Sequence, residues 1–430
     1  MQRTSVELFA GGGGLVQAAT NAGFRHLLLN EFAPRACETL EANGFKRYEE
    51  GTRPPVPEPG DEVPLVAGDV RKLEMEYLRE RGVDLLAGGP PCQPFSLGGV
   101  ARGDEDQRNM FPEMFRAVRE IRPKAVLCEN VVGLLRPSFA PYFEYIQREL
   151  ELPFVERQEG TDWKKHDKTL RERLAAGDDD PSKRYNVLMT RVNAADYGVP
   201  QVRNRVILVA FRADLGVDMS AFADSVEPTH SRDLLIKALR DESYWDDHKG
   251  VAKHVRDRVT ARYANEQLSF DDSPNDGHEQ SRSRWLTLRD AIKDLPRVDL
   301  DVLDKKTPQG GVPDHIGWPG ARIYKGHTPN ELDNPAKTVK AGVHGVPGGE
   351  SVMRLDDRGE EPDAPGGDGY RYRYMTVRET ARVMTFGDDW QLRGPRGERM
   401  RQLGNAVPVR LGQVFASAIS DALGKAESRS

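Results

Sequence analysis

The first half of the chain alternates short apolar runs with stretches in which apolar positions recur at helical spacing. The predominantly apolar stretches lie at residues 5–9, 26–29, 64–66, 83–87 and 124–128 and predict buried strands. Helices are predicted between these strands, at residues 15–19, 34–43 and 112–121. This alternation predicts an α/β domain built on a mostly parallel sheet.

Two longer runs follow, at residues 185–194 and 202–211, and predict a strand pair around a turn at residues 196–200. On the second run Gln201, Arg203 and Arg205 alternate, so the three side chains are expected on one face of the strand. Residues 51–64 and the charged residues 156–184 are predicted to be solvated surface insertions.

From about residue 213 to residue 374 the alternation of strand and helix disappears. Glycine, proline and aspartate dominate, one clear helix is predicted at residues 287–295, and residues 335–341 and 342–349 are interpreted as recognition loops. Helical order returns at residues 375–384 and in a closing helix that ends near residue 423. We expect three segments: residues 1–212, a loop-rich second domain at 213–397, and residues 398–430 returning to the first domain.

Composition narrows the class of protein without naming a function. Hydrophobic residues make up 38% of the 430 residues and charged residues 30%, as in an ordinary soluble globular protein. No apolar run approaches the roughly 18 residues of a membrane helix, and the first residues do not resemble a signal peptide. The net charge of −6 argues mildly against nonspecific nucleic-acid binding but leaves room for local basic surfaces.

Only three cysteines are present, too few and odd in number for a disulfide framework, which fits a reducing cytoplasm. Cys37 lies within the predicted helix at 34–43 and is expected to pack in the core. Cys128 points the opposite way from Glu129 on an extended chain, so it is also expected in the core. Cys92 follows the strand at 83–87 and is bracketed by Pro-Pro and Gln-Pro, a stiff loop that could present a nucleophile. The alternative for Cys92 is a small buried thiol.

The four glycines at residues 11–14 stand between a strand and a helix, where glycines permit close backbone approach to a ligand and a helix supplies free N–H groups. The dinucleotide fingerprint is broken at Val16, so an NAD site is disfavoured; a plain flexible turn is the other alternative. Glu31, just after the second strand, stands where a ribose hydroxyl pair is usually accepted, and Phe32 beside it could lie against an adenine ring.

The carboxyl ends of parallel strands meet at one edge of a sheet, and neighbouring strands are about 4.8 Å apart. Cys92 and Glu129 are therefore expected to face one pocket, although a solvated strand-end carboxylate is the alternative for Glu129. Arg203 and Arg205 could hold an anion or a carbonyl oxygen beside that pocket, or could be ordinary surface charge.

Taken in order, these segments resemble the motif series of the C5-cytosine DNA methyltransferases. The matching stretches are Phe-Ala-Gly-Gly-Gly-Gly at 9–14, Pro-Cys-Gln at 91–93, Glu-Asn-Val at 129–131, Gln-Val-Arg-Asn-Arg at 201–205, Arg-Glu at 378–379 with Arg382, and Gly-Asn at 404–405 with Pro408. The resemblance implies a Rossmann-like methyltransferase fold, with a mixed, mostly parallel seven-stranded sheet and a loop-rich target-recognition domain.

The resemblance also implies roles for individual residues. The catalytic group would be Cys92, Glu129, Arg203 and Arg205. Cofactor contacts would come from Phe9, Gly11, Gly13, Glu31, Phe32, Asp69, Val70, Pro90 and Asn405. Substrate contacts would come from Gln93, Ser96, Gln201 and Thr338, and no metal is expected.

The implied activity is methylation of carbon 5 of cytosine in a specific sequence of double-stranded DNA, with S-adenosyl-L-methionine as donor and thiolate addition to a flipped-out base. A monomer in the cytoplasm is expected, associated with the nucleoid if the source is prokaryotic. The enzyme would act either beside a cognate restriction endonuclease or as a stand-alone modification enzyme. Two alternatives stay open: a tRNA-directed cytosine methyltransferase, and a catalytically silent relative that binds DNA.

Overall fold

The protein is described by a computed structural model that covers residues 2–91, 109–268, 282–323, 328–342, 351–359 and 369–429. The first half contains β1 (Thr4–Leu8), α1 (Gly14–Asn21), β2 (Arg25–Glu31), α2 (Pro34–Ala42), β3 (Lys46–Glu49), β4 (Pro64–Ala67), β5 (Leu85–Gly88), α3 (Phe111–Ile121), β6 (Ala125–Val131), α4 (Ala140–Glu151), α5 (Trp163–Ala176), β7 (Tyr185–Asn193) and β8 (Asn204–Arg212).

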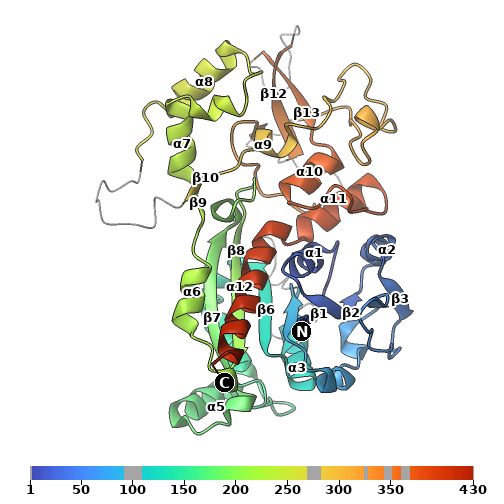
Figure 1. The fold of residues 1–430 in the computed structure, drawn as a ribbon, viewed down its shortest axis with the longest axis vertical. Coiled ribbons are helices and arrows are strands. Elements are labelled where there is room, and N and C mark those ends of the chain that lie inside the picture. The colour runs from blue at the N-terminus through green and yellow to red at the C-terminus, as the bar shows by residue number, and fades with distance from the viewer. Residues whose placement is uncertain are drawn as a thin grey trace.

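The second half contains α6 (Met219–Ser225), β9 (His230–Ser231), α7 (Arg232–Arg240), α8 (Lys253–Tyr263), β10 (Ser283–Arg284), α9 (Leu288–Ile292), β11 (Asn330–Glu331), β12 (Val352–Arg358), β13 (Tyr370–Tyr374), α10 (Val377–Val383), α11 (Arg396–Asn405) and α12 (Val409–Glu427). Figure 1 shows the large sheet in the lower half of the molecule and α7, α8, β12 and β13 in the upper half.

The large sheet has eight strands in the order β3-β4-β2-β1-β5-β6-β8-β7. β8 is antiparallel to both of its neighbours, so it alone runs against the other seven. The chain moves outward from β1 to β2 and then returns to the opposite side of β1 at β5. The strand order therefore reverses at β1 and β5, and crevices that bind ligands form at such a reversal.

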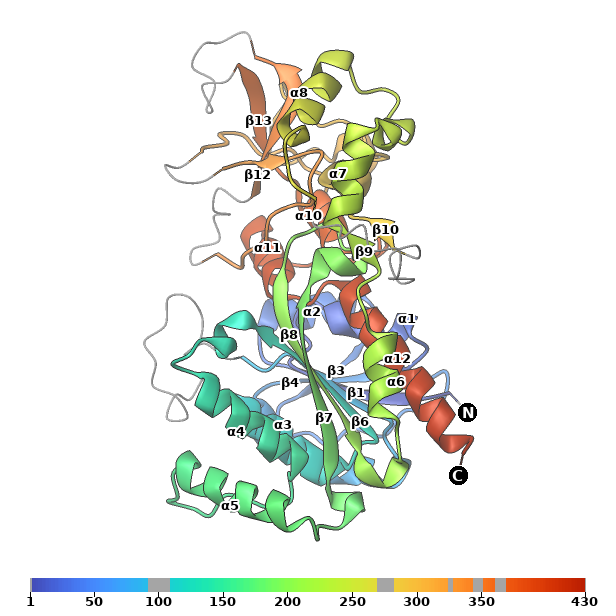
Figure 2. The same cartoon turned by 90° about the vertical axis from the view of Figure 1, so that its left-hand side faces the viewer.

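Helices cover both faces of this sheet, as its strands require. β5 is buried along its whole length, and β1 is buried from Ser5 to Leu8, which is typical of parallel strands between two helical layers. α3 and α4 pack on one face, and α1, α6 and α12 pack on the other (Figure 2). The predicted α/β class and mostly parallel sheet are confirmed.

The sheet has one strand more than expected, because β3 was not recognised. Its sequence Lys-Arg-Tyr-Glu is polar and mostly exposed, so it lacks the apolar alternation that marks a strand. The expected face shared by Gln201, Arg203 and Arg205 is also wrong. β8 begins at Asn204, so of the three only Arg205 lies on the strand, while Gln201 and Arg203 belong to the turn before it.

Two regions contain more helix than the sequence indicated. The insertion at 156–184 holds α5, which packs beside α4 through Trp163, His166 and Leu170 rather than being solvated throughout. The region from residue 213 onward holds α6, α7 and α8 in addition to the predicted helix α9. Among the described residues, no helix is long and apolar enough to cross a membrane.

The end of the chain returns to the large sheet. α10 begins at a capping box formed by Thr376 and Glu379. Together with α11 it packs against α1 through a cluster that includes Ala18, Ala381 and Leu403. α12 then buries Phe415 and Ile419 against the sheet. α10 and α11 therefore lie beside α1, whereas α12 covers one face of the sheet.

Candidate functional site

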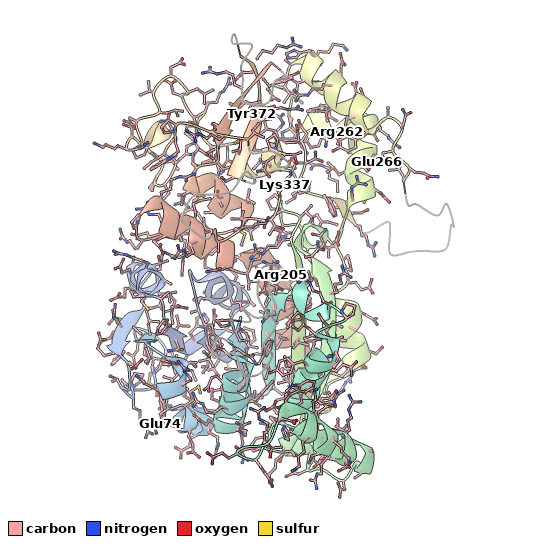
Figure 3. All side chains as sticks on the ribbon, turned by 180° about the vertical axis from the view of Figure 1, so that it is seen from behind. Glu74, Arg205, Arg262, Glu266, Lys337 and Tyr372 are labelled. Carbon is pink, nitrogen blue, oxygen red and sulfur yellow. The ribbon has the colours of Figure 1, made fainter. Side chains whose placement is uncertain are left out.

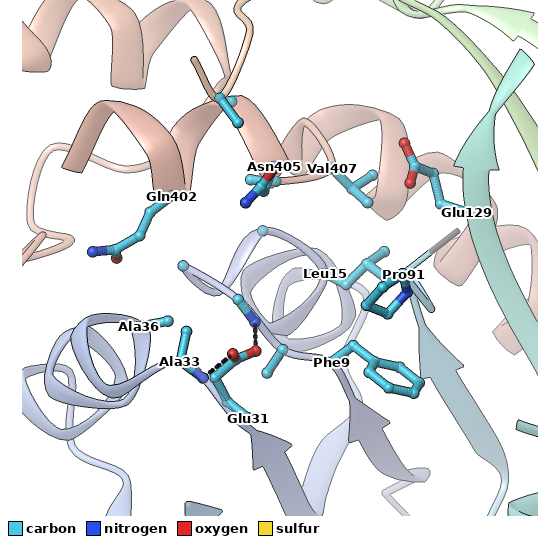
Figure 4. Close-up of a pocket in the computed structure, with 18 of the residues that line it drawn as sticks. Phe9, Leu15, Glu31, Ala33, Ala36, Pro91, Glu129, Gln402, Asn405 and Val407 are labelled. Atoms are coloured by element: carbon cyan, nitrogen blue, oxygen red, sulfur yellow. Dashed lines mark hydrogen bonds between the residues drawn. The ribbon is translucent and has the colours of Figure 1, made fainter. Parts of the chain in front are cut away.

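A cavity of about 680 Å³ lies at the carboxyl ends of β1, β2, β4, β5 and β6. Residues 338–341 and 398–407 line its opposite side. In Figure 4, Glu31 and Phe9 lie below the cavity, Asn405 and Val407 lie above it, and Glu129 stands at one end. The strand ends and the returning C-terminal helices thus enclose a single space.

The glycine run forms the turn from β1 into α1. Phe9, Gly11 and Gly13 all have positive φ, at 57°, 55° and 89°, and Gly13 is the residue before the first turn of α1. A Cβ on Gly13 would lie 2.3 Å from Cζ2 of Trp390, so only glycine fits here. The run therefore keeps a fixed shape, and the N–H groups of the first turn of α1 lie at the cavity.

The C-terminal segments close on this glycine run. Nε1 of Trp390 donates to the carbonyl of Gly12 at 2.9 Å. A Cβ on Gly14 would lie 2.2 Å from the carbonyl oxygen of Val407. Sequence reasoning found the glycines but not Trp390 or Val407, because no local pattern joins residues almost 400 positions apart.

Glu31 is the last residue of β2 and is buried. Its two carboxylate oxygens accept hydrogen bonds from the backbone N–H of Gly11 at 2.6 Å and of Ala33 at 2.7 Å (Figure 4). Burial raises the pKa of Glu31, and these backbone donors oppose the rise. The neighbouring Phe32 is 72% exposed and lines the cavity, so its ring is available to a planar ligand.

A second carboxyl group, on Glu7 of β1, was not singled out from the sequence. It lines the cavity floor with only 1% of the residue exposed, and its Oε2 has no hydrogen-bond partner within the described part of the chain. Burial, reinforced by the charge of Glu31, raises its pKa well above the usual value. Glu7 therefore places a buried carboxyl oxygen without a hydrogen-bond partner, among the described residues, beside the cavity.

Asp69 and Val70 line the cavity beyond β4. The Asp69 carboxylate accepts from the backbone N–H of Arg71 at 3.0 Å and from its guanidinium at 2.5 Å, and this pairing lowers the pKa of Asp69. Arg71 also lines the cavity and was not predicted.

Glu129 lies inside β6, not just beyond it as the sequence suggested. Its residue is 7% exposed, and Nε of Arg205 on β8 lies 2.7 Å from its Oε1. The Nε–H is not directed along a hydrogen bond to that oxygen, so the contact is ionic. Figure 3 shows Arg205 near the middle of the molecule, where the two halves meet. A carboxyl group and a guanidinium thus face the cavity together.

Cys92, Gln93 and Ser96 lie outside the described residues. The positions on either side of the undescribed segment are held, however. The carbonyl of Pro90 accepts from Nδ2 of Asn130 at 3.0 Å, and the backbone N–H of Met110 donates to the carbonyl of Pro91 at 3.2 Å. Pro90 and Pro91 line the cavity beside Glu129.

Arg203 was expected to act on the substrate, but its guanidinium is bonded within the protein. It donates to the backbone carbonyls of Val339 at 2.9 Å, Gly404 at 2.8 Å and Ala406 at 2.9 Å. The residue is 1% exposed. Burial, followed by the charge of Arg205, lowers its pKa to about 9.

Gln201 is likewise turned inward. It is fully buried, its Nε2 donates to the sulfur of Met384 at 3.0 Å, and its Oε1 accepts from the backbone N–H of Val339 at 3.1 Å. Thr338 does line the cavity, but its hydroxyl donates to the carbonyl of Val202 at 2.7 Å. Residues 336–339 therefore pack against the turn before β8 and are not a free recognition loop. Residues 343–349 lie outside the described residues.

Cys37 and Cys128 occupy the core, as expected, and burial raises the pKa of each thiol to about 12. Neither can supply a thiolate near neutral pH. Asn405 ends α11 and is exposed at the cavity wall. The described residues contain no cluster of three or more His, Cys, Asp or Glu side chains that could hold a metal ion.

Comparison with known proteins gives consistent matches. A family model described as C-5 cytosine-specific DNA methylase matches residues 3–152 and 165–421. The chain is 30% identical over 421 residues to the type II methyltransferase M.PspPI of Psychrobacter sp. (strain TA137), covering 96% of this chain and 78% of that protein. It is 28% identical over 426 residues to the type II methyltransferase M.NgoMIV of Neisseria gonorrhoeae, covering 99% of both.

Among solved structures, the S. pombe Dnmt2 methyltransferase has a TM-score of 0.54 and 15% sequence identity, covering 98% of this chain and 99% of that chain. At this sequence identity the match is evidence for the fold alone. The interruption of the family model at residues 153–164 covers the connection from α4 to α5 and the first two residues of α5.

Proposed function

The chain belongs to the family of C-5 cytosine-specific DNA methylases, and we propose that the cavity beside β1 and β6 is where it carries out this reaction. The protein methylates carbon 5 of cytosine in DNA. Its relatives are type II methyltransferases, so we place the modified cytosine within one recognition sequence, which a cognate restriction endonuclease would also read. The observation that carries the proposal is the Glu129–Arg205 pair in the same cavity as the glycine run and Glu31.

The part of the cavity next to β1 and β2 suits S-adenosyl-L-methionine. Glu31 offers carboxylate oxygens to the two ribose hydroxyls, and the exposed ring of Phe32 can lie against the adenine. The N–H groups of the first turn of α1 suit the carboxylate of the methionine portion. Gly11, Gly13, Asp69, Val70, Pro90 and Asn405 complete this part of the proposed site. When bound, the cofactor supplies the electrophilic methyl group.

The other part of the cavity, beside Glu129, would hold the cytosine. Carbon 5 of cytosine is too weak a nucleophile to take a methyl group unaided. We propose that the Cys92 thiolate adds to carbon 6, which makes carbon 5 resemble an enamine carbon and divides one difficult step into two easier ones.

Glu129 and Arg205 would stabilise this adduct. This step requires Glu129 to bind a proton, or to share one with N3, in the complex with the base: as the thiolate adds, that proton passes to N3, and the guanidinium of Arg205 holds the oxygen on carbon 2. After carbon 5 is methylated, it loses its proton to water, and the electron pair restores the double bond between carbons 5 and 6 as the carbon–sulfur bond breaks. N3 returns its proton to Glu129, and the Cys92 thiolate is regenerated. The ionic contact between Glu129 and Arg205 keeps both groups at one end of the cavity.

The target base must leave the duplex to reach this position, at a cost of a few kcal/mol. We propose that residues 213–397 act as the target-recognition domain whose DNA contacts offset that cost, that residues 1–212 and 398–430 form the catalytic part, and that the enzyme works as a monomer on cytoplasmic DNA.

The proposal is tested by methyl transfer from S-adenosyl-L-methionine labelled in its methyl group. Duplex DNA and tRNA are offered separately to the wild type and to Cys92→Ala. We expect label in duplex DNA with the wild type only, and cofactor binding retained in Cys92→Ala. Turnover of Cys92→Ala within tenfold of the wild type, or label in tRNA instead of DNA, would refute the assignment.

A further inference from the structure

Arg203 places a positive charge in the interior beside the cavity. Its residue is 1% exposed, and the charge of Glu129, which forms its ion pair with Arg205, offsets only part of the cost of burying the Arg203 guanidinium. Nε of Arg203 has no hydrogen-bond partner within the described ranges. Burying a charged group is costly unless other interactions compensate. The hydrogen bonds of the Arg203 guanidinium therefore show which parts of the structure it stabilises.

Those bonds join two segments that lie far apart in the sequence. One donor holds the carbonyl of Val339, and two hold the carbonyls of Gly404 and Ala406, on either side of Asn405. The two segments also touch each other, since a Cβ on Gly404 would lie 2.4 Å from the backbone nitrogen of Ala341. Both line the cavity.

The backbone of Arg203 is itself firmly held. Its N–H donates to Oδ1 of Asn193 at 3.1 Å, and its carbonyl accepts from the N–H of Ala194 at 2.9 Å. Arg205, two residues further along the chain, contacts Glu129. The backbone of residues 203–205 is thus anchored to the end of β7, with the two arginine side chains serving different parts of the cavity.

The wall that Arg203 holds is the wall that meets the glycine run. Residues 404–407 contain two of the carbonyl groups that Arg203 binds, and the backbone of Val407 lies against Gly14. A shift of this wall would change the width of the part of the cavity that we assign to the cofactor, while Glu129 and Arg205 stayed on β6 and β8.

We propose that Arg203 is a positioning residue that fixes the spacing between the cofactor wall at residues 404–407 and the Glu129–Arg205 pair. The proposal rests on the assignment of this cavity to S-adenosyl-L-methionine and cytosine. Only a planar guanidinium can reach the two segments at once with separate donors, whereas the ammonium of lysine is a single point. Misplacing a reactant by about 1 Å can cost on the order of a hundredfold in rate.

The test compares Arg203→Lys and Arg203→Met with a control, Arg373→Lys. Arg373 is also buried and also binds through its fork, to Glu379 at 2.6 and 2.7 Å, but it does not line the cavity. The affinity for S-adenosyl-L-methionine is measured by calorimetry, the methylation rate by single turnover at saturating cofactor, and folding by thermal melting.

We expect Arg203→Met to weaken cofactor binding at least tenfold and to slow the single turnover at least tenfold. Arg203→Lys, which retains the charge but can bind only one of the two segments at a time, should recover no more than a small part of both losses. Arg373→Lys should lower the melting temperature while its cofactor affinity stays within twofold of the wild type. If both Arg203 variants bind the cofactor within twofold of the wild type, Arg203 has no positioning role.

Hydrogen–deuterium exchange keeps the test decisive if Arg203→Met does not fold. In Arg203→Lys the backbone amides of residues 336–341 and 402–407 should exchange faster together, and in Arg373→Lys they should not. Unchanged exchange in either segment would overturn the proposal. This readout needs no cofactor, so a wild type that fails to bind S-adenosyl-L-methionine would refute the proposed function separately.

Discussion

Replacing Gly14 with alanine tests whether the C-terminal wall closes on the glycine run as described. Gly14 is the first residue of α1, and an added Cβ would lie 2.2 Å from the carbonyl oxygen of Val407 and 3.3 Å from Cβ of Ala406. Gly424 in α12 provides a matched control. It is also a helical glycine, it is exposed, and its nearest neighbour would be Nη2 of Arg3 at 3.5 Å, an ordinary contact.

Helix propensity favours both substitutions, because alanine is more stable than glycine in a helix by up to about 1 kcal/mol. At Gly424 nothing opposes that gain, so we expect the variant to be more stable by roughly 0.5 kcal/mol. At Gly14 the contact is more than 1 Å too short, and the opposing atom is backbone that cannot turn aside. Overpacking of this kind costs about 1–3 kcal/mol, so we expect a net loss of roughly 1–2 kcal/mol.

Urea unfolding followed by circular dichroism measures both free energies, and calorimetry measures the affinity for S-adenosyl-L-methionine. Because Gly14 and Val407 line the cavity we assign to the cofactor, Gly14→Ala should also weaken cofactor binding at least tenfold, while Gly424→Ala should leave it unchanged. A Gly14→Ala variant as stable as Gly424→Ala, with wild-type cofactor affinity, would show that the wall does not press on the glycine run.

Three further outcomes are expected. Glu129→Gln preserves the size of the side chain but removes the proposed proton donor, so single-turnover methylation should slow at least tenfold while cofactor affinity stays within twofold; an unchanged rate would remove Glu129 from the mechanism. Since burial raises the pKa of Cys37 and Cys128 to about 12, roughly one thiol in ten thousand is ionised at pH 8. Mass spectrometry should find both unmodified by iodoacetamide in the folded protein and modified in urea, and labelling of either in the folded protein would contradict their placement. Burial lowers the pKa of His26 from 6.5 to about 4, so between these pH values the unfolded chain binds a proton that the folded chain does not. The stability present above pH 6.5 is therefore lost as the pH falls to 4, by up to roughly 3 kcal/mol, and urea unfolding of His26→Gln should show a shallower loss; equal pH dependence would refute this.

Most of the strands that the sequence revealed are buried along nearly all of their length, with β7 as the exception. β1, β2, β5 and β6 lie between two helical layers, and each carries buried apolar residues, such as Val6 and Leu8 in β1 and residues 27–29 in β2. β3 stands at the edge of the sheet and is held by backbone bonds to β4, which any sequence can make. The side chains of β3 therefore give no indication that it pairs with β4.

The helices that were missed divide into two kinds. α7 carries a readable signal, since Ser231 caps it and Leu235, Ile236 and Leu239 lie on one face. α5 carries a weaker signal, because Trp163, Leu170 and Leu174 are its main apolar contacts with the core and most of its other residues are charged. The sequence therefore indicates α7 but gives little indication of α5.

The candidate site shows the same division. Glu31 and Glu129 were predicted because each stands at or near the end of an apolar run, and the geometry of a parallel sheet brings such ends together. Arg203 was assigned to the substrate on the alternation of three polar residues. That inference failed because the strand begins one residue after Arg203, and the acceptors of its guanidinium lie 136 or more positions away.

The connection between the two halves of the molecule bears directly on how a base could be presented. The turn before β8 and the segment at 336–339 are joined by hydrogen bonds from the N–H of Val202 to the carbonyl of Ala336 and from the N–H of Ala336 to the carbonyl of Pro200, each 2.8 Å long. The Thr338 hydroxyl and the Gln201 amide add two more. The proposed recognition region is therefore fastened next to Arg205 rather than attached only by linkers at its two ends. These four hydrogen bonds, together with the packing of α10 on α1 and the bond from Trp390 to Gly12, would set the position of DNA held by that region relative to the Glu129–Arg205 pair, so recognition of the sequence and placement of the base are physically linked.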